Sequence, residues 1–410
     1  MKSSVICFSD NVLLGRCDND VLGQIGKHLY KAGIFLQSTT VMSCQNKVYN
    51  INASEKNNHL FVIVLDDKQQ AFVDFMSFLA KTYGIELKEN LLAQKFFLQS
   101  HKSVQPDLRN TERLIYCLPS QCDFVATTNS SFLTTFFKVA NNHFAVLPST
   151  IDYDSLDKLM DIVKRKFEIN THVEVLKTFG ITNSECALKI SDIISNEKSV
   201  NISICENGLE NEIILRSNQD NKSQLSNIMR EIYARLAAYV YLENDLPSPK
   251  TVFSLLKSKR LTLSIAESVT GGEVASTLIK NNDGASEFIK EGIVCYSNES
   301  KQKSLGVSAL TISKHTAVSS EVAYEMAAGM LNKAKTDLVV CTTGYASTAD
   351  KPQNQGLCYI AIGDQNEIHI YKNYFYGTRE HVISQVCQAV NYYLIKKLRK
   401  NDFHFLNNKL

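Results

Sequence analysis

The chain has 410 residues, of which 44% are hydrophobic and 21% are charged, and its formal net charge is +2 at pH 7. This length exceeds one ordinary hydrophobic core, so we expect two to four domains. The near-neutral charge gives no general support for binding nucleic acid or an anionic membrane, and no apolar run approaches the length of a membrane span. Asp10 and Asn11 interrupt the first apolar run, so we predict no secretory leader and a cytoplasmic protein.

The chain contains eleven cysteines, an odd number. No CxxC pair occurs, and no histidine or second cysteine pair joins Cys117 and Cys122, the closest two, to complete a zinc pattern. We therefore predict reduced thiols rather than a metal site. Most of the cysteines are expected in buried strands, among them Cys7, Cys205, Cys295, Cys341 and Cys358.

Strand and helix patterns alternate over residues 1–165. This βαβ rhythm predicts an α/β domain with a parallel or mixed sheet covered by helices. Asp66 and Asp67 directly follow one predicted strand, and two interpretations stay open: paired carboxylates can hold magnesium, or they can cap the next helix. We expect strands over residues 4–9, 34–42, 59–67, 113–120 and 143–150, and helices over residues 18–32 and 69–84.

Residues 166–247 predict a small α+β domain without a catalytic constellation. Two short alternating strands, residues 199–208 and 211–218, precede a long helix expected over residues 223–242. The two prolines of Leu246-Pro247-Ser248-Pro249 then make a stiff boundary before the last domain, residues 248–410.

The last domain is organised around residues 261–301. An alternating strand ends at a turn of hydroxyls and paired glycines, Ser268 to Gly272, and a helix follows. The N–H groups at the start of a helix can hold a phosphate, a carboxylate or a developing oxyanion. Two further strand ends carry polar groups, so we predict that one edge of this sheet collects Ser268, Thr270, Tyr296, Lys301, Thr342, Thr343 and Gly344.

This collection has a catalytic interpretation and a structural one. A serine beside a neutral lysine can attack an acyl carbon, and a forked arginine, Arg379, can hold a phosphate or carboxylate. However, hydroxyl-and-glycine turns are also common helix caps, and Glu267 fits either a role in the site or a buried cap. We expect His315 and His369 to be structural or exposed, because neither has a partner pattern.

Four motifs of the last domain resemble the C-terminal domain of the competence/damage-inducible protein CinA family. They are AESVTGG, EGIVCYSNESK, LGVSALTISKHTAVSS and EVAYEMAAGM, and the family forms are AESCTGG, GGVVSYSNEAK and LGV–HGAVSEEVA–MA-G. The resemblance implies an amidase that hydrolyses the carboxamide of nicotinamide mononucleotide to nicotinate mononucleotide and ammonia, without a metal or cofactor. It implies a serine nucleophile, because the cysteine of AESCTGG is Val269 here.

Roles for individual residues follow from this resemblance as expectations. Ser268 would be the nucleophile and Lys301 its base, with Tyr296 as a third catalytic residue. Arg379 would bind the substrate phosphate. The rest of the implied substrate site comprises Glu267, Thr270, Gly271, Gly272, Thr343 and Gly344.

Upstream segments resemble the same family. Residues 10–36 are similar to its opening motif and residues 177–190 to the start of its middle domain, which implies a molybdopterin-biosynthesis-protein-like domain, a small α+β domain and the amidase domain. The family usually forms homodimers, so we expect one here. The family's GGLGPTxDD strand end, tied to a metal-dependent ADP-ribose pyrophosphatase, reads VIVLDDKQQ at residues 62–70. We therefore predict an inactive N-terminal site, and a divalent metal only if that site is active.

A second departure keeps a non-catalytic alternative open. The family's GIAGPxGG loop reads GYASTAD over residues 344–350, and the missing glycines remove close backbone approach. The chain is then either an amidase or a CinA-like protein that binds a nucleotide or serves as a scaffold. A third alternative is a metal-dependent ADP-ribose pyrophosphatase that acts through residues 1–165.

Overall fold

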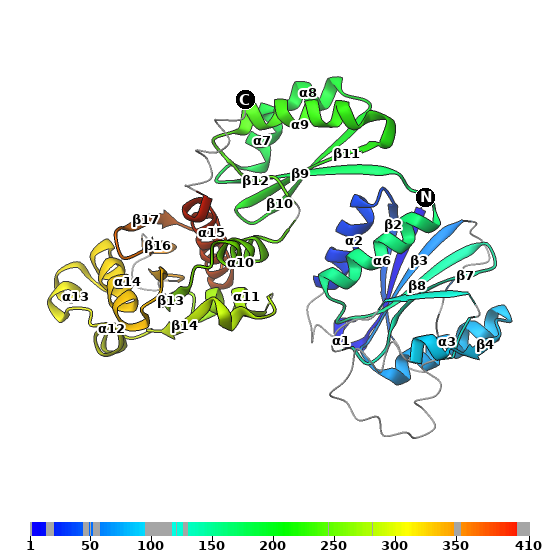
Figure 1. Ribbon diagram of the computed structural model, residues 1–410, viewed down its shortest axis with the longest axis horizontal. Coiled ribbons are helices and arrows are strands. Elements are labelled where there is room, and N and C mark those ends of the chain that lie inside the picture. The colour runs from blue at the N-terminus through cyan, green and yellow to red at the C-terminus, as the bar shows by residue number, and fades with distance from the viewer. Residues whose placement is uncertain are drawn as a thin grey trace. The chain divides into compact units, whose positions relative to one another are not determined.

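The computed structural model describes residues 2–13, 20–43, 49, 51, 58–94, 117–119, 121–125, 130–244, 246–280, 282–347 and 354–399 (Figure 1). Most of the predicted strand at 113–120 lies outside these ranges. The chain forms two compact units, one of residues 1–173 with 216–220 and one of residues 174–215 with 221–410. The fold is α/β, with a separate sheet in each of several parts of the chain. Among the described helices, none has the length and apolar composition that a membrane span requires.

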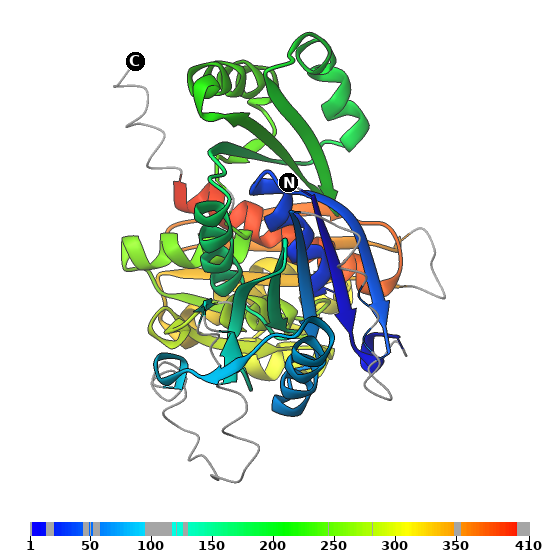
Figure 2. The same ribbon diagram turned by 90° about the vertical axis from the view of Figure 1, so that its right-hand side faces the viewer.

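The first unit contains a six-stranded mixed sheet in the order β2-β1-β3-β8-β7-β6. Its first four strands in that order are parallel, β7 is antiparallel to β8, and β6 is antiparallel to β7. Its two N-terminal strands, β1 and β2, are drawn in blue in Figure 2. Successive residues of β1 face opposite layers: Val5 packs with α2 and α6, and Ile6 packs with α3. The elements are β1 (Lys2–Phe8), α1 (Asp10–Leu13), α2 (Asp20–Lys31), β2 (Phe35–Met42), β3 (His59–Leu65), α3 (Gln69–Tyr83), β4 (Leu87–Glu89), β5 (Cys117–Pro119), β6 (Cys122–Val125), β7 (Thr134–Val139), β8 (Asn142–Pro148) and α6 (Tyr153–Lys166).

The mixed sheet covered by helices confirms the sequence-based prediction for this part of the chain. Strand β7 was not predicted, because its sequence TTFFKV does not alternate between polar and apolar residues. It pairs with β8 in a tight hairpin whose turn contains Ala140 at φ +52°. Both faces of β7 are buried, so its apolar residues are continuous rather than alternating.

The second unit holds a four-stranded sheet in the order β10-β11-β9-β12. The predicted helix 223–242 is wrong in its last part, because it ends at Leu236 and residues 240–242 form a strand that pairs with β9. Cys205 is exposed rather than buried, because β10 is an edge strand. The elements are β9 (Thr171–Phe179), α7 (Asn183–Lys189), α8 (Ser191–Asn196), β10 (Val200–Asn207), β11 (Glu210–Asn218), α9 (Lys222–Leu236) and β12 (Val240–Leu242).

A five-stranded sheet follows in the same unit, in the order β14-β13-β15-β16-β17. Strands β14, β13 and β15 are parallel, β16 is antiparallel to β15, and β17 is antiparallel to β16. The carboxyl ends of β13, β14, β15 and β17 therefore meet at one edge. The elements are α10 (Ser248–Lys259), β13 (Leu263–Glu267), α11 (Glu273–Lys280), β14 (Ile289–Val294), α12 (Asn298–Leu305), α13 (Ala309–His315), α14 (Ser320–Ala334), β15 (Leu338–Gly344), β16 (Leu357–Gly363), β17 (Ile368–Tyr374) and α15 (Arg379–Arg399).

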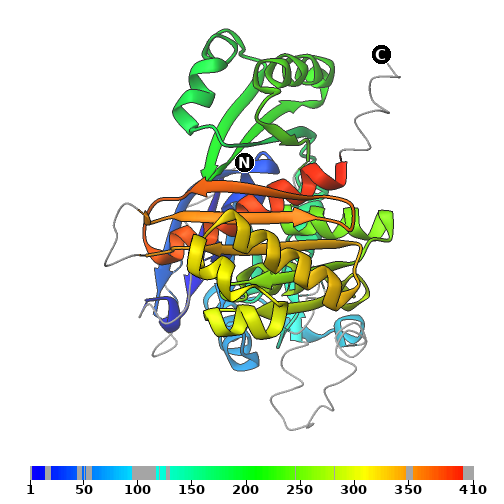
Figure 3. The same ribbon diagram turned by 90° about the vertical axis from the view of Figure 1, so that its left-hand side faces the viewer.

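Helices cover both faces of this sheet. One face is covered by α14 (Figure 3). This helix buries Val322, Met326 and Met330, the spacing predicted for a core-facing helix, and Ser319 caps its N-terminus as expected. On the other face α10, α11 and α15 pack against Ile265 and Val340 of the central strands. This arrangement leaves the carboxyl edge of the sheet as the place where loops from four strands come together.

Candidate active site

Ser268 is the first residue after β13, at the carboxyl edge of the five-stranded sheet. Its backbone N–H donates to the carbonyl of Thr342, at 3.0 Å, so the end of β15 fixes the turn. The side chain is almost completely buried. A hydroxyl at the end of a central strand is held by the sheet itself, which is the rigid support that a nucleophile needs.

Lys301 reaches Ser268 from α12, the helix that follows the neighbouring strand β14. The predicted strand end over residues 296–301 is in fact a short connection after β14 followed by α12, which Ser297 caps. The Lys301 amine lies 2.9 Å from the Ser268 Oγ atom and 2.9 Å from the carbonyl oxygen of Cys295. Its side chain is only 2% exposed. Two residues 33 positions apart in the sequence are thus in direct contact in a buried site.

Burial lowers the pKa of the Lys301 amine below its usual value of 10.5, and the nearby Cys341 and Cys295 thiols oppose this effect. A lowered pKa raises the neutral fraction of the amine at ordinary pH. A neutral amine has two N–H donors and one lone pair. It can donate to the Cys295 carbonyl while its lone pair accepts the Ser268 proton, which is the arrangement of a general base.

The turn after Ser268 has two glycines in the left-handed region, Gly271 at φ +61° and Gly272 at φ +104°. The Thr270 hydroxyl is hydrogen-bonded to that of Thr342, at 2.8 Å. Within the described residues, the backbone N–H groups of Val269 and Thr270 have no hydrogen-bond acceptor. Donors beside a nucleophile are suited to hold a developing oxyanion.

Glu267 has the structural role that the sequence left open for it. Its buried carboxylate accepts hydrogen bonds from the backbone N–H groups of Gly272, Val274 and Ala275, at 2.9, 3.1 and 2.9 Å. The first turn of α11, which we expected to be available for a substrate anion, is therefore occupied by a carboxylate of the chain itself. Glu267 fixes α11 and the turn that carries Ser268.

Thr343 and Gly344, at the end of β15, support the neighbouring loops. The Thr343 hydroxyl donates to the carbonyl of Ala317, at 2.9 Å. A Cβ atom on Gly344 would lie 2.3 Å from the Cys358 sulfur, so a larger residue does not fit there. Of the 344–350 loop discussed above, residues 348–350 lie outside the described residues.

Arg379 is the first residue of α15 and lies at the rim of the site. Its guanidinium donates to the Tyr296 hydroxyl at 2.8 Å and to the Ser347 hydroxyl at 3.1 Å. Tyr296 is 64% exposed, and its hydroxyl is bonded to Arg379 rather than to the serine–lysine pair. An exposed arginine held by two hydroxyls can replace these bonds with bonds to an anion.

Sequence reasoning missed two groups of this site. The Cys295 carbonyl, which orients the lysine amine, is a backbone group that no residue pattern reveals. Ser347 lies in the 344–350 loop, for which the sequence analysis considered only the missing glycines. Its contact with Arg379 depends on the path of the chain from β17 to α15.

Asp67, the second residue of the Asp66–Asp67 pair in the first unit, also has a structural role. Asp67 accepts hydrogen bonds from the backbone N–H and hydroxyl of Ser131, at 2.7 and 2.6 Å, and from the Thr150 hydroxyl, at 2.5 Å. These bonds tie three loops together and favour the turn interpretation over magnesium. Within the described ranges, no group of three or more His, Cys, Asp or Glu side chains is placed to hold a metal ion.

Thr316 carries backbone strain next to the site, in the loop whose Ala317 carbonyl accepts the Thr343 hydroxyl. Its φ of +69° and ψ of +165° are tolerated essentially only by glycine. We expect Thr316→Gly to raise the free energy of unfolding by about 1 kcal/mol, because the relief of about 1–3 kcal/mol exceeds the added chain entropy of glycine. Thermal unfolding measures this, and Thr316→Ala, which keeps the strain, is expected to give no gain. An equal gain from alanine would contradict the interpretation.

Comparison with known proteins gives a consistent result. A family model described as the CinA C-terminal domain matches residues 246–398. A putative competence-damage inducible protein of Clostridioides difficile (strain 630) is 28% identical over 410 residues, covering 93% of this chain and 96% of that one. A CinA-like protein of Citrifermentans bemidjiense is 30% identical over 316 residues, 75% of each chain. A solved CinA superfamily structure from Klebsiella pneumoniae is 28% identical, with a TM-score of 0.36, over 38% of this chain and 99% of that one.

Proposed function

Because the chain belongs to the CinA family, as its motifs predicted, we propose that residues 248–410 are an amidase domain that hydrolyses nicotinamide mononucleotide to nicotinate mononucleotide and ammonia. One observation carries the proposal: the hydroxyl of Ser268 and the buried amine of Lys301 are 2.9 Å apart. A serine hydroxyl is a weak nucleophile unless a base removes its proton, and a desolvated lysine supplies that base.

The proposed reaction proceeds through an acyl-enzyme. The neutral Lys301 amine takes the Ser268 proton as the Oγ atom attacks the carboxamide carbon, and the carbonyl oxygen becomes an oxyanion near the N–H groups of Val269 and Thr270. The Lys301 ammonium then gives its proton to the departing amide nitrogen, which leaves as ammonia. A water molecule, deprotonated by Lys301, attacks the ester, and the released Ser268 recovers its proton. Lysine performs each proton transfer, so the proposed steps require no metal ion.

We assign recognition of the substrate phosphate to Arg379, at the edge of the site. The Arg379 guanidinium carries a positive charge and five donors, which suit the phosphate of the mononucleotide. Its present partners, Tyr296 and Ser347, are neutral hydroxyls that a phosphate can displace or share. We assign the phosphate to Arg379 rather than to the start of α11, because Glu267 already fills that helix terminus.

The proposal gives the other parts of the chain non-catalytic roles. Residues 1–165 are a domain retained for assembly, residues 166–247 connect it to the amidase domain, and the protein acts as a cytoplasmic homodimer. The engagement of Asp67 by Ser131 and Thr150 supports an inactive first site, because metal binding would have to break these bonds.

The test is an assay of the purified full-length protein with nicotinamide mononucleotide, measuring ammonia and nicotinate mononucleotide. We expect equimolar products from the wild type and only background from Ser268→Ala. Ser276→Ala, the same change at an exposed position of α11, is the control and should retain full activity. Wild-type turnover no higher than that of Ser268→Ala would instead support a CinA-like protein that only binds a nucleotide.

A further inference from the structure

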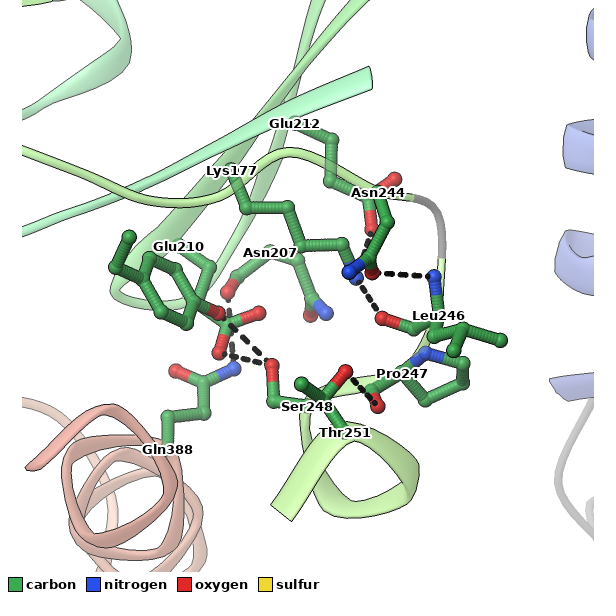
Figure 4. Close-up of polar contacts among 11 residues, drawn as sticks. Lys177, Asn207, Glu210, Glu212, Asn244, Leu246, Pro247, Ser248, Thr251 and Gln388 are labelled. Atoms are coloured by element: carbon green, nitrogen blue, oxygen red, sulfur yellow. Dashed lines mark hydrogen bonds and ion pairs between the residues drawn. The ribbon is translucent and has the colours of Figure 1, made fainter. Parts of the chain in front are cut away.

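The turn between β10 and β11 is bound by one side chain of α15 (Figure 4). The Gln388 amide nitrogen donates to the carbonyl of Asn207 at 2.9 Å, and its oxygen accepts the N–H of Leu209, also at 2.9 Å. Gly208, between them, has φ +65°, and a Cβ atom there would lie 2.5 Å from the Gln388 oxygen. The turn therefore has the backbone conformation and the space that this amide requires.

Two further contacts lie on the same face of α15. Tyr392 stacks on Phe179 with ring centroids 4.1 Å apart, and Arg399 donates to the carbonyl of Tyr241 at 3.1 Å. Positions 388, 392 and 399 fall on one face of a helix with 3.6 residues per turn. The four-stranded sheet thus contacts α15 at three levels along its length.

The turn is itself held in place by the start of α10. The Ser248 hydroxyl donates to the Glu210 carboxylate at 2.9 Å (Figure 4). It accepts from the Tyr241 hydroxyl at 2.8 Å. Burial raises the pKa of the Tyr241 phenol, which keeps it a donor. A buried ion pair between Lys177 and Glu212, at 3.2 Å, lies beside this group. Because these polar groups are buried and paired, the turn offers α15 a fixed support.

The face of α15 that packs on its own sheet is different in kind. It consists of apolar side chains, among them Val382, Val386 and Val390. Apolar contacts are not directional, so they hold the helix against the sheet without fixing its position along its axis.

Directional bonds fix that position. Within its own domain, α15 has bonds between Gln385 and the backbone of Tyr376, from the Tyr393 hydroxyl to Asn373, and from Lys397 to Asp364 and Glu367. The two bonds of Gln388 add a support from the four-stranded sheet. Arg379 lies nine residues away on the same helix, about 14 Å at 1.5 Å per residue.

We propose that Gln388 is a positioning residue for substrate binding: its bonds to the 207–209 turn add to the contacts that fix α15 along its axis, and thereby place Arg379 where the guanidinium meets the substrate phosphate. The four-stranded sheet is then part of the binding machinery rather than a passive connector. This inference rests on the proposed function, since it names the support of that same site.

The test compares two substrates in Gln388→Met, which keeps the side-chain volume but loses both hydrogen bonds. We expect KM for nicotinamide mononucleotide to rise about fivefold to tenfold, the equivalent of about one neutral hydrogen bond, with kcat nearly unchanged. The dephosphorylated nucleoside, which Arg379 does not bind through a phosphate, should show no change in KM. Gly208→Ala, which crowds the same amide from the turn, should reproduce the effect. Gln224→Met, the same change on α9, is the control.

A second readout separates this inference from the proposed function. Hydrogen exchange of the backbone amides of residues 376–382 reports the order of the start of α15 without any substrate. We expect faster exchange there in Gln388→Met and unchanged exchange in Gln224→Met. Unchanged exchange, or equal rises in KM for both substrates, would overturn the positioning role. If the wild type had no amidase activity, the proposed function would be refuted. The hydrogen-exchange rates of residues 376–382 would then still test whether Gln388 supports α15.

Discussion

Lys301→Met is expected to lower kcat for nicotinamide mononucleotide hydrolysis by at least a thousandfold. Methionine has nearly the length of lysine but no proton acceptor that can activate Ser268. Loss of a general base typically removes about 10²–10⁴ in rate, and the same amine also protonates the leaving nitrogen. Ser268→Ala, Lys301→Met and the double variant should all show the same residual rate, because the two residues act as one unit.

The pH dependence tests the same assignment in the wild type. Burial lowers the pKa of Lys301 below 10.5, and only the neutral amine is a base. Activity should therefore rise tenfold per pH unit on the acid side and level off once the pH passes this lowered pKa, below 10.5. A rate that falls as the pH rises through the neutral range, or a Lys301→Met variant with more than a few per cent of wild-type activity, would contradict a lysine base.

The same shift has a consequence for stability. Because the folded-state pKa of Lys301 lies below its unfolded value, the unfolded chain binds more protons between the two pKa values. The free energy of unfolding should therefore increase with pH across that interval through this group. The burial of Lys301 therefore lowers the free energy of unfolding at pH values below both pKa values. A lysine with a purely structural role would avoid this loss of stability by extending its amine into solvent.

Elements whose structure is determined by their own residues could be predicted from the sequence. The alternation before Ser268 and the paired glycines after it predicted a strand and a turn, and both are present. The elements that depend on distant partners were not predicted. Residues 240–242 continue a helical pattern in sequence, but pairing with β9 makes them a strand. Likewise, the sequence placed Lys301 at a strand end, whereas capping by Ser297 starts a helix before it.

For the site, the residue types were visible in the sequence, but their partners were not. Glu267 lies next to Ser268, yet only the fold shows its carboxylate turned toward the start of α11. The short distance between Ser268 and Lys301 follows from the parallel pairing of β13 and β14, which aligns their carboxyl ends. Topology therefore supplied the geometry that residue spacing alone could not.

The second large effect is expected at Gly329, in the interior of α14. A Cβ atom there would lie 1.8 Å from the carbonyl oxygen of Leu305, the last residue of α12. In an open helix, Gly→Ala adds about 1 kcal/mol of stability. Here the clash is with backbone, which no side-chain rotation can relieve, and overpacking of this kind costs about 1–3 kcal/mol or more.

We therefore expect Gly329→Ala to lower the free energy of unfolding by at least about 2 kcal/mol and to lower kcat, because α12 carries Lys301 and must move away from α14. Calorimetry and the ammonia assay measure the two effects. Gly23→Ala in α2, where a Cβ atom meets nothing within 4 Å, is the matched control and should be slightly stabilising and fully active. If Gly329→Ala were as stable and active as this control, the close approach of α12 and α14 would not be what holds the lysine against the serine.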